Sequence, residues 1–253
     1  MLIKSISLTN YKQFYRAEML EFCPGVNIIQ GNGQTGKTTV LHLLNCLLSV
    51  SPVKDYYAHG IMRESFNWSA ERKHNQRKKD SIIYAVIEVT SSDLDKVAYV
   101  NRHISKLPDK GKSGLKVFNL EPGDSFIYKI VNGKEVIERK GKAYIQYLKH
   151  YYQLRETNKN LKPLVKCFPE GRTVDLEKCK GYDVVLIDNL FGSLSSEKQE
   201  QYLDEVLKYQ DLYKTQFIIT IMDGHSQVIN RETNSDANWV FLKDYLRMHL
   251  HLT

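Results

Sequence analysis

The sequence predicts an α/β fold with a largely parallel central sheet, and three short stretches indicate it. The run "VNIIQG" at 26–31 is apolar, ends in glycine and is followed by a helical pattern over 37–48. The run "DVVLID" at 183–188 also precedes a helical pattern, and "QFIITIM" at 216–222 is a third apolar run. Short apolar strands that alternate with helices are typical of buried parallel sheets.

Further strands are predicted on either side of the first helix. Residues 2–8, "LIKSISL", alternate between polar and apolar side chains, as a half-buried strand does. The runs "SIIYAVIEV" at 81–89 and "VAYVNRHIS" at 97–105 are strand-like, and "SSDLD" at 91–95 is predicted as the turn between them.

Two helices are predicted in the second half of the chain. The first covers residues 141–155, where apolar side chains recur at helical spacing. We interpret this tyrosine-rich stripe as a packing face rather than a base-stacking platform. It consists of Tyr144, Tyr147, Leu148, Tyr151 and Tyr152. The second helix begins at a capping box formed by Ser196 and Gln199 and runs through Leu207.

The 253 residues suit one sizeable core, so we predict a single domain over residues 1–253. It carries a basic insertion near 66–80 and a variable helical and loop region near 105–180. No apolar run is long enough to cross a bilayer, and the first residues lack the continuous apolar core of a secretory signal. Four scattered cysteines favour reduced thiols over a zinc site, so the expected location is cytoplasmic.

The strongest motif is a complete match to the Walker A pattern, G-x-x-x-x-G-K-[ST]. Its residues are Gly31, Asn32, Gly33, Gln34, Thr35, Gly36, Lys37, Thr38 and Thr39. In this pattern backbone N–H groups converge on phosphate oxygens, and the following helix adds its positive N-terminal dipole. Lys37 is placed to reach the β and γ phosphates of ATP, and Thr38 to ligate Mg²⁺. An ordinary glycine turn is the competing interpretation, but the flanking strand and helix disfavour it.

Asp188 is the natural second half of this site, because it ends an apolar strand from which a carboxylate can hold a Mg²⁺-bound water. We therefore predict Thr38 and Asp188 as the metal-binding residues. Asn189 follows, at a position where many such enzymes place a glutamate that activates water. A neutral amide cannot accept that proton, although its oxygen can orient a water molecule. Asp188 and Asn189 are the predicted catalytic pair.

A wider pattern around the Walker A motif includes Asn10, Tyr11, Phe14, Gly25, Asn27 and residues 31–39. This pattern resembles the SMC/RecF-like ATPases, the DNA-associated branch of the ABC ATPase superfamily. "VVLIDNLFGSLSSEKQEQYLDEV" looks like the family's Walker B strand, D-loop and helix, and "TQFIITIMD" like the strand that carries its switch histidine. The resemblance implies a P-loop NTPase head with an N-terminal antiparallel β lobe.

The departures from that family shape the functional prediction. No Ser-Gly-Gly-Gln-like signature loop precedes the Walker B strand, and Met222 stands at the switch-histidine position, with His225 nearby. No long heptad array lies between Lys37 and Asp188, which excludes a long coiled coil. The resemblance thus implies slow or partner-dependent ATP hydrolysis, with a partner protein supplying the missing elements or a dimer of unusual geometry. A carboxylate such as Asp223, or a group from the partner, is the alternative source of the missing base.

Three functions stay open on the sequence. The first is an ATP-binding, SMC/RecF-like protein in DNA metabolism or genome defence, and the second is a nucleotide-dependent assembly subunit that does not hydrolyse ATP. A P-loop phosphotransferase is a minor alternative. The net charge of +7 and the pI of about 9.0 allow DNA as a further partner. The predicted contacts are Arg72, Lys73, Arg77, Lys78 and Lys79, whose alternative role is a solvated loop.

Overall fold

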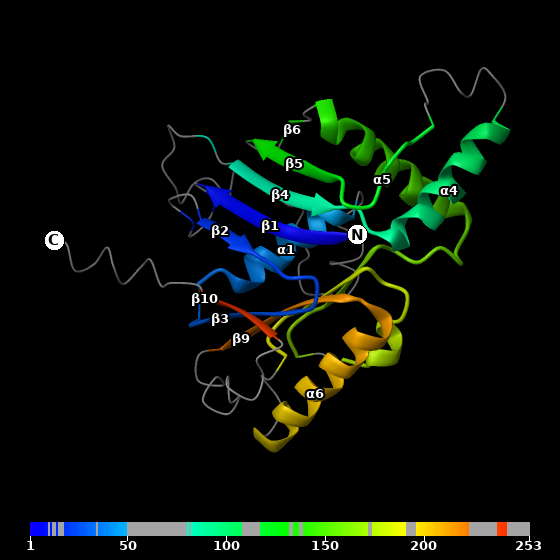
Figure 1. Cartoon of the computed structure of the whole chain (residues 1–253). Helices are drawn as coiled ribbons and strands as arrows, with labels where there is room; N and C mark the ends of the chain where they lie inside the picture. The colour runs from blue at the N-terminus through cyan, green and yellow to red at the C-terminus, as the bar shows by residue number, and fades with distance from the viewer. Residues whose placement is uncertain are drawn as a thin grey trace.

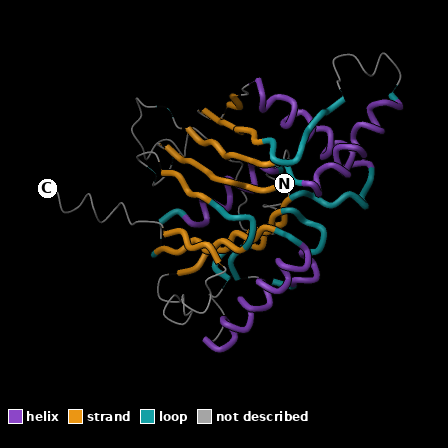
Figure 2. Tube along the Cα trace, viewed as in Figure 1, coloured by secondary structure: helices purple, strands orange, loops and turns teal. Residues whose placement is uncertain are grey.

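In the residues that it describes, the computed structural model contains two five-stranded sheets with helix α1 (Lys37–Leu48) between them (Figures 1 and 2). Ten of the twelve residues of α1 are buried, which explains why this helix is apolar on most faces. The structure describes residues 1–9, 11, 14, 18–33, 35–49, 80, 82–107, 117–131, 134–136, 139–171, 174–190, 196–222 and 237–241.

The core sheet is parallel throughout and has the strand order β10-β3-β9-β8-β7. Its strands are β3 (Val26–Gly31), β7 (Val165–Phe168), β8 (Val184–Ile187), β9 (Gln216–Met222) and β10 (Ala237–Phe241). β3, β8 and most of β9 are buried, because α1 covers one face and α6 (Ser196–Tyr213) the other. The predicted α/β fold with a parallel core is confirmed.

The second sheet is antiparallel and has the order β2-β1-β4-β5-β6. It is formed by β1 (Leu2–Thr9), β2 (Glu18–Glu21), β4 (Ile82–Glu88), β5 (Ser125–Val131) and β6 (Lys134–Val136). This is the N-terminal antiparallel lobe that the resemblance implied. The β5–β6 hairpin lies inside the region that was predicted as variable helix and loop. That region also contains β7 and a short 3₁₀ helix, η2 (Leu176–Cys179).

One predicted strand is wrong. The run at 97–105 lies inside helix α4 (Ser91–Lys106), and the predicted turn at 91–95 is its first turn. The side chains of Val97, Val100 and Ile104 are buried at helical spacing. The Asp93 carboxylate accepts a hydrogen bond from the Thr90 backbone N–H at 2.7 Å, so a local cap starts the helix. Tertiary packing and this cap outweigh the β-propensity of the valines.

The tyrosine-rich stripe is a packing face, as predicted. It lies on α5 (Arg139–Thr157), which packs on β5 and α4, and all five side chains of the stripe are buried. Tyr144 stacks on Phe126 of β5, with ring centroids 5.0 Å apart. Helix α6 is longer than predicted and extends beyond Leu207 to Tyr213, because Tyr209 adds another contact with Phe217 of the core sheet.

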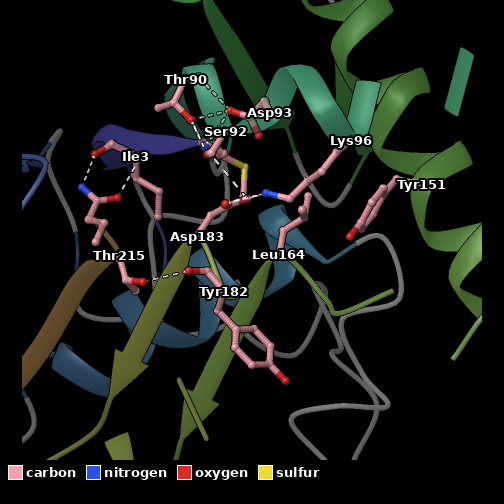
Figure 3. Close-up of polar contacts among 12 residues, drawn as sticks. Ile3, Thr90, Ser92, Asp93, Lys96, Tyr151, Leu164, Tyr182, Asp183 and Thr215 are labelled. Atoms are coloured by element: carbon pink, nitrogen blue, oxygen red, sulfur yellow. Dashed lines mark hydrogen bonds and ion pairs between the residues drawn. The ribbon is translucent and has the colours of Figure 1, made fainter. Parts of the chain in front are cut away.

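Polar contacts join the two sheets where β8 begins (Figure 3). Asp183 precedes β8, and its carboxylate oxygens lie 2.6 and 2.8 Å from Lys96 Nζ of α4. The amino group of Met1, directly before β1, lies 3.9 Å from Asp183 Oδ2. Buried Gln216 accepts a hydrogen bond from the Ile3 N–H and donates one to the Ile3 carbonyl, each at 2.8 Å. These contacts fix the antiparallel lobe against the core sheet.

In the part of the chain that the structure describes, no helix is both long and apolar enough to cross a membrane. The predicted basic insertion near 66–80 lies outside the described residues, apart from Asp80.

Candidate nucleotide-binding site

The Walker A loop connects the end of β3 to the start of α1, at the carboxyl edge of the parallel sheet. Gly36 precedes the helix with φ 100° and ψ 11°, a left-handed conformation that strains any residue with a Cβ. The first turn of α1 contains no acidic residue of its own. This arrangement of loop and helix is suited to binding an anion. Gln34 of the motif lies outside the described residues.

The side chains of the loop are held by its own carbonyl groups. Lys37 Nζ donates to the carbonyl oxygens of Gly31 and Asn32, each at 2.6 Å, and Thr35 Oγ1 donates to Asn32 at 2.9 Å. Lys37 is 7% exposed, so its ammonium group is fixed within the loop rather than extended into solvent. The ammonium group of Lys37 therefore lies beside the loop backbone that would bind phosphate oxygens.

The two predicted metal-binding residues come together. Asp188 follows β8, and its carboxylate accepts hydrogen bonds from the hydroxyl of Thr38 and from Thr220 Oγ1, the latter at 2.7 Å. Burial raises the pKa of Asp188 and nearby Glu170 adds to this, whereas the two hydroxyl hydrogen bonds and Lys37 act in the opposite direction. A hydroxyl and a carboxylate are oxygen ligands of the kind that Mg²⁺ takes from protein, beside phosphate and water. The residues fit this ion.

Asn189 has an unusual backbone conformation, with φ 48°. Asparagine tolerates this left-handed region better than most residues, and glutamate is less suited to it. The Asn189 N–H donates to Thr220 Oγ1 at 2.8 Å, so one threonine of β9 bonds both Asp188 and the residue after it. Backbone geometry is therefore a physical reason for asparagine at this position.

Glu170, which lies two residues after β7, was not predicted as a site residue from the sequence. Its Oε1 accepts a hydrogen bond of 2.5 Å from Asn189 Nδ2. Both residues line a cavity of about 370 Å³ at the Walker A loop, together with Gly33, Gly36, Lys37, Thr38, Thr39, Asp188 and Met222. In the sequence, the only indication of this residue is "PEG" at 169–171, directly after the apolar run "LVKCF". The parallel pairing of β7 with β8 brings Glu170 to the site.

Other predicted residues are placed differently or fall outside the described residues. Met222, at the predicted switch position, lies in the cavity wall, and its Cε is 3.8 Å from where a Cβ on Gly33 would be. Asp223, His225 and the basic residues Arg72, Lys73, Arg77, Lys78 and Lys79 all lie outside the described residues. They remain predictions.

A family model described as an AAA domain matches residues 5–238. The chain belongs to the AAA domain family. A curated relative of this AAA domain chain is the DNA replication and repair protein RecF of Cytophaga hutchinsonii, which is 25% identical over 258 aligned positions. The alignment covers 97% of the chain but only 64% of that protein's length. These matches confirm the prediction of an SMC/RecF-like branch of the ABC ATPases.

One similar solved structure is an Smc head bound to the C-winged helix domain of ScpA. It is 11% identical to this chain, with a TM-score of 0.43, and the match covers 90% of this chain and 92% of that one. The SMC head domain from Thermotoga maritima has 12% identity, a TM-score of 0.38, and coverage of 91% and 93%. RecF with ATP has 11% identity, a TM-score of 0.37, and coverage of 88% and 93%. The fold assignment rests on the two sheets described above.

Proposed function

We propose that this chain binds ATP with Mg²⁺ at residues 31–39 and acts in DNA metabolism or genome defence as part of a complex. The observation that carries the proposal is the meeting of Thr38 and Asp188 beside a glycine loop at a helix N-terminus. The family and the RecF relative support the link to DNA metabolism. The cavity of about 370 Å³ lies within the usual range for small-ligand sites.

Each residue of the site has a distinct role in this proposal. The loop N–H groups and the N-terminus of α1 bind phosphate oxygens, and Lys37 neutralises charge on the β and γ phosphates. Thr38 and Asp188 would hold Mg²⁺, which when bound offsets the charge that develops in phosphoryl transfer. The ion also favours ionised Asp188, opposing the effect of its burial.

We propose that hydrolysis by the isolated chain is slow, or requires a partner. Asn189 presents a neutral amide at the position of the activating glutamate, and the sequence lacks a signature loop that a second head would contribute. A protein partner that supplies this loop, or a dimer of unusual geometry, would complete the site. A nucleotide-bound homodimer with an ordinary head-to-tail sandwich would contradict this part of the proposal.

The experiment that tests the function is ATP binding and turnover by the purified chain, with and without DNA. Binding is measured by calorimetry in the presence and absence of Mg²⁺, and turnover by release of labelled phosphate. We expect binding that strengthens with Mg²⁺ and a slow basal rate. Binding without any turnover would favour an assembly subunit that does not hydrolyse ATP, an alternative supported by the amide of Asn189. Transfer of phosphate to an acceptor other than water would indicate a phosphotransferase.

A further inference from the structure

Glu170 and Asn189 occupy equivalent places on two neighbouring parallel strands. Phe168 at the end of β7 pairs with Ile187 at the end of β8, and Glu170 and Asn189 each lie two residues beyond that pair. Gly171 then turns the chain with φ 76°. The two side chains meet through the 2.5 Å hydrogen bond at the wall of the cavity that Lys37 and Thr38 also line.

We propose that Glu170 accepts the proton of the attacking water during ATP hydrolysis, and that Asn189 positions the Glu170 carboxylate. This assignment rests on the proposed function. It places the activating carboxylate at the end of β7, instead of on the residue after Asp188.

Asn189 holds Glu170 through its side-chain amide nitrogen. An ionised carboxylate only accepts hydrogen bonds, so the amide must turn its Nδ2 toward Glu170, and this fixes the direction of its Oδ1. Asn189 Oδ1 is buried and has no hydrogen-bond partner among the described residues. Asn189 therefore acts through Nδ2, which holds the Glu170 carboxylate at the wall of the cavity.

The other acidic residue of the cavity is already engaged. Asp188 is 7% exposed and accepts hydrogen bonds from Thr38 and Thr220, which suits a metal ligand but leaves it poorly placed to take a proton from water. Glu170 is exposed, and Asn189 is its hydrogen-bond partner in the described part of the chain. Asp188 is therefore assigned to metal binding and Glu170 to proton acceptance.

The water oxygen forms a bond to the γ phosphorus while one of its protons passes to Glu170. The bond from the γ phosphorus to the oxygen that bridges it to the β phosphorus breaks, and its electron pair leaves with ADP. Glu170 then returns the proton to solvent. A positioned general base contributes about 10²–10⁴-fold to the rate of such a step.

The test compares Glu170→Gln with wild type, using Glu177→Gln as the matched control. Glu177 is also exposed, lies seven residues further along in η2 and does not line the cavity. With excess protein over labelled ATP, we expect Glu170→Gln to lower the single-turnover rate by about 100-fold or more. ATP affinity should stay within about twofold, because the carboxylate is assigned to the water and not to the nucleotide. The control should match wild type.

A second measurement identifies the nucleotide that stays bound after a long incubation with ATP. Wild type and Glu177→Gln should yield ADP, whereas Glu170→Gln should retain ATP. If wild type binds ATP but hydrolyses it no faster than Glu170→Gln does, or does not hydrolyse it at all, the role of Glu170 is wrong while the proposed ATP binding stands. Failure of wild type to bind ATP would overturn the proposed function and this assignment with it.

Discussion

Replacing Gln216 with alanine should weaken the junction between the two sheets. Gln216 begins β9, is fully buried, and its amide makes three hydrogen bonds of 2.8 Å to backbone groups of the antiparallel lobe and its link to β3. The partners are the Ile3 N–H, the Ile3 carbonyl and the Cys23 carbonyl. Gln216→Ala removes all three and leaves the Ile3 N–H without this acceptor.

The magnitude follows from these contacts. A buried donor that loses its acceptor costs about 1–3 kcal/mol, and the two weakened carbonyls add to this, so about 3 kcal/mol is expected in total. A chain of this size loses about 2–4 °C of melting temperature per kcal/mol, which gives a drop of about 6–12 °C. Thermal unfolding followed by circular dichroism measures it. Gln201→Ala, at an exposed position of α6, is the matched control and should shift the melting temperature little. A Gln216→Ala variant that melts with wild type would refute the reasoning.

Three further predictions concern the site and its surroundings. Burial raises the pKa of Asp188 in the folded protein. The folded state is therefore more stable when Asp188 is neutral, and it loses this stability as the pH rises through the folded pKa. Asp188→Asn should therefore raise the melting temperature at pH 7, and by less at acidic pH. It should also abolish the Mg²⁺ dependence of ATP binding. A lower melting temperature at pH 7 would contradict this prediction. Asn189→Glu alone should not speed turnover, since it sets a second carboxylate against Glu170 and puts glutamate at φ 48°. Combined with Glu170→Gln it should recover part of the rate that the Glu170→Gln change removes, as single-turnover assays would show. Replacing Arg77, Lys78 and Lys79 with glutamine should weaken DNA binding alike for all sequences and flatten its salt dependence by up to about three units of slope; an unchanged slope would assign these residues to solvent.

The features predictable from sequence are those that local chemistry dictates. The Walker A loop is readable because Gly36 must adopt a left-handed backbone and Lys37 must begin the helix. The tyrosine stripe of α5 is readable because helical periodicity alone fixes which face is buried. Asp188 was found because it ends an apolar strand in a chain that already shows a phosphate loop.

The missed features depend on packing between segments. Residues 97–105 have strand propensity, and only the cap at Thr90 and Asp93 and the packing of α4 against α5 make them helical. Glu170 carries no local mark of function, since its contact with Asn189 arises from the parallel pairing of β7 with β8. A single sequence contains no direct record of that pairing.

The central claim is that residues 31–39 bind ATP, and the affinity of Lys37→Ala tests it most directly. Lys37 supplies the one cationic side chain that lines the cavity among the described residues, and a charged hydrogen bond lost there costs up to about 3 kcal/mol. Calorimetry should therefore show ATP affinity falling by up to about 100-fold in Lys37→Ala, with the fold retained. Lys208→Ala, at an exposed position of α6, should bind as wild type does. Equal ATP affinity in Lys37→Ala and wild type would contradict the account.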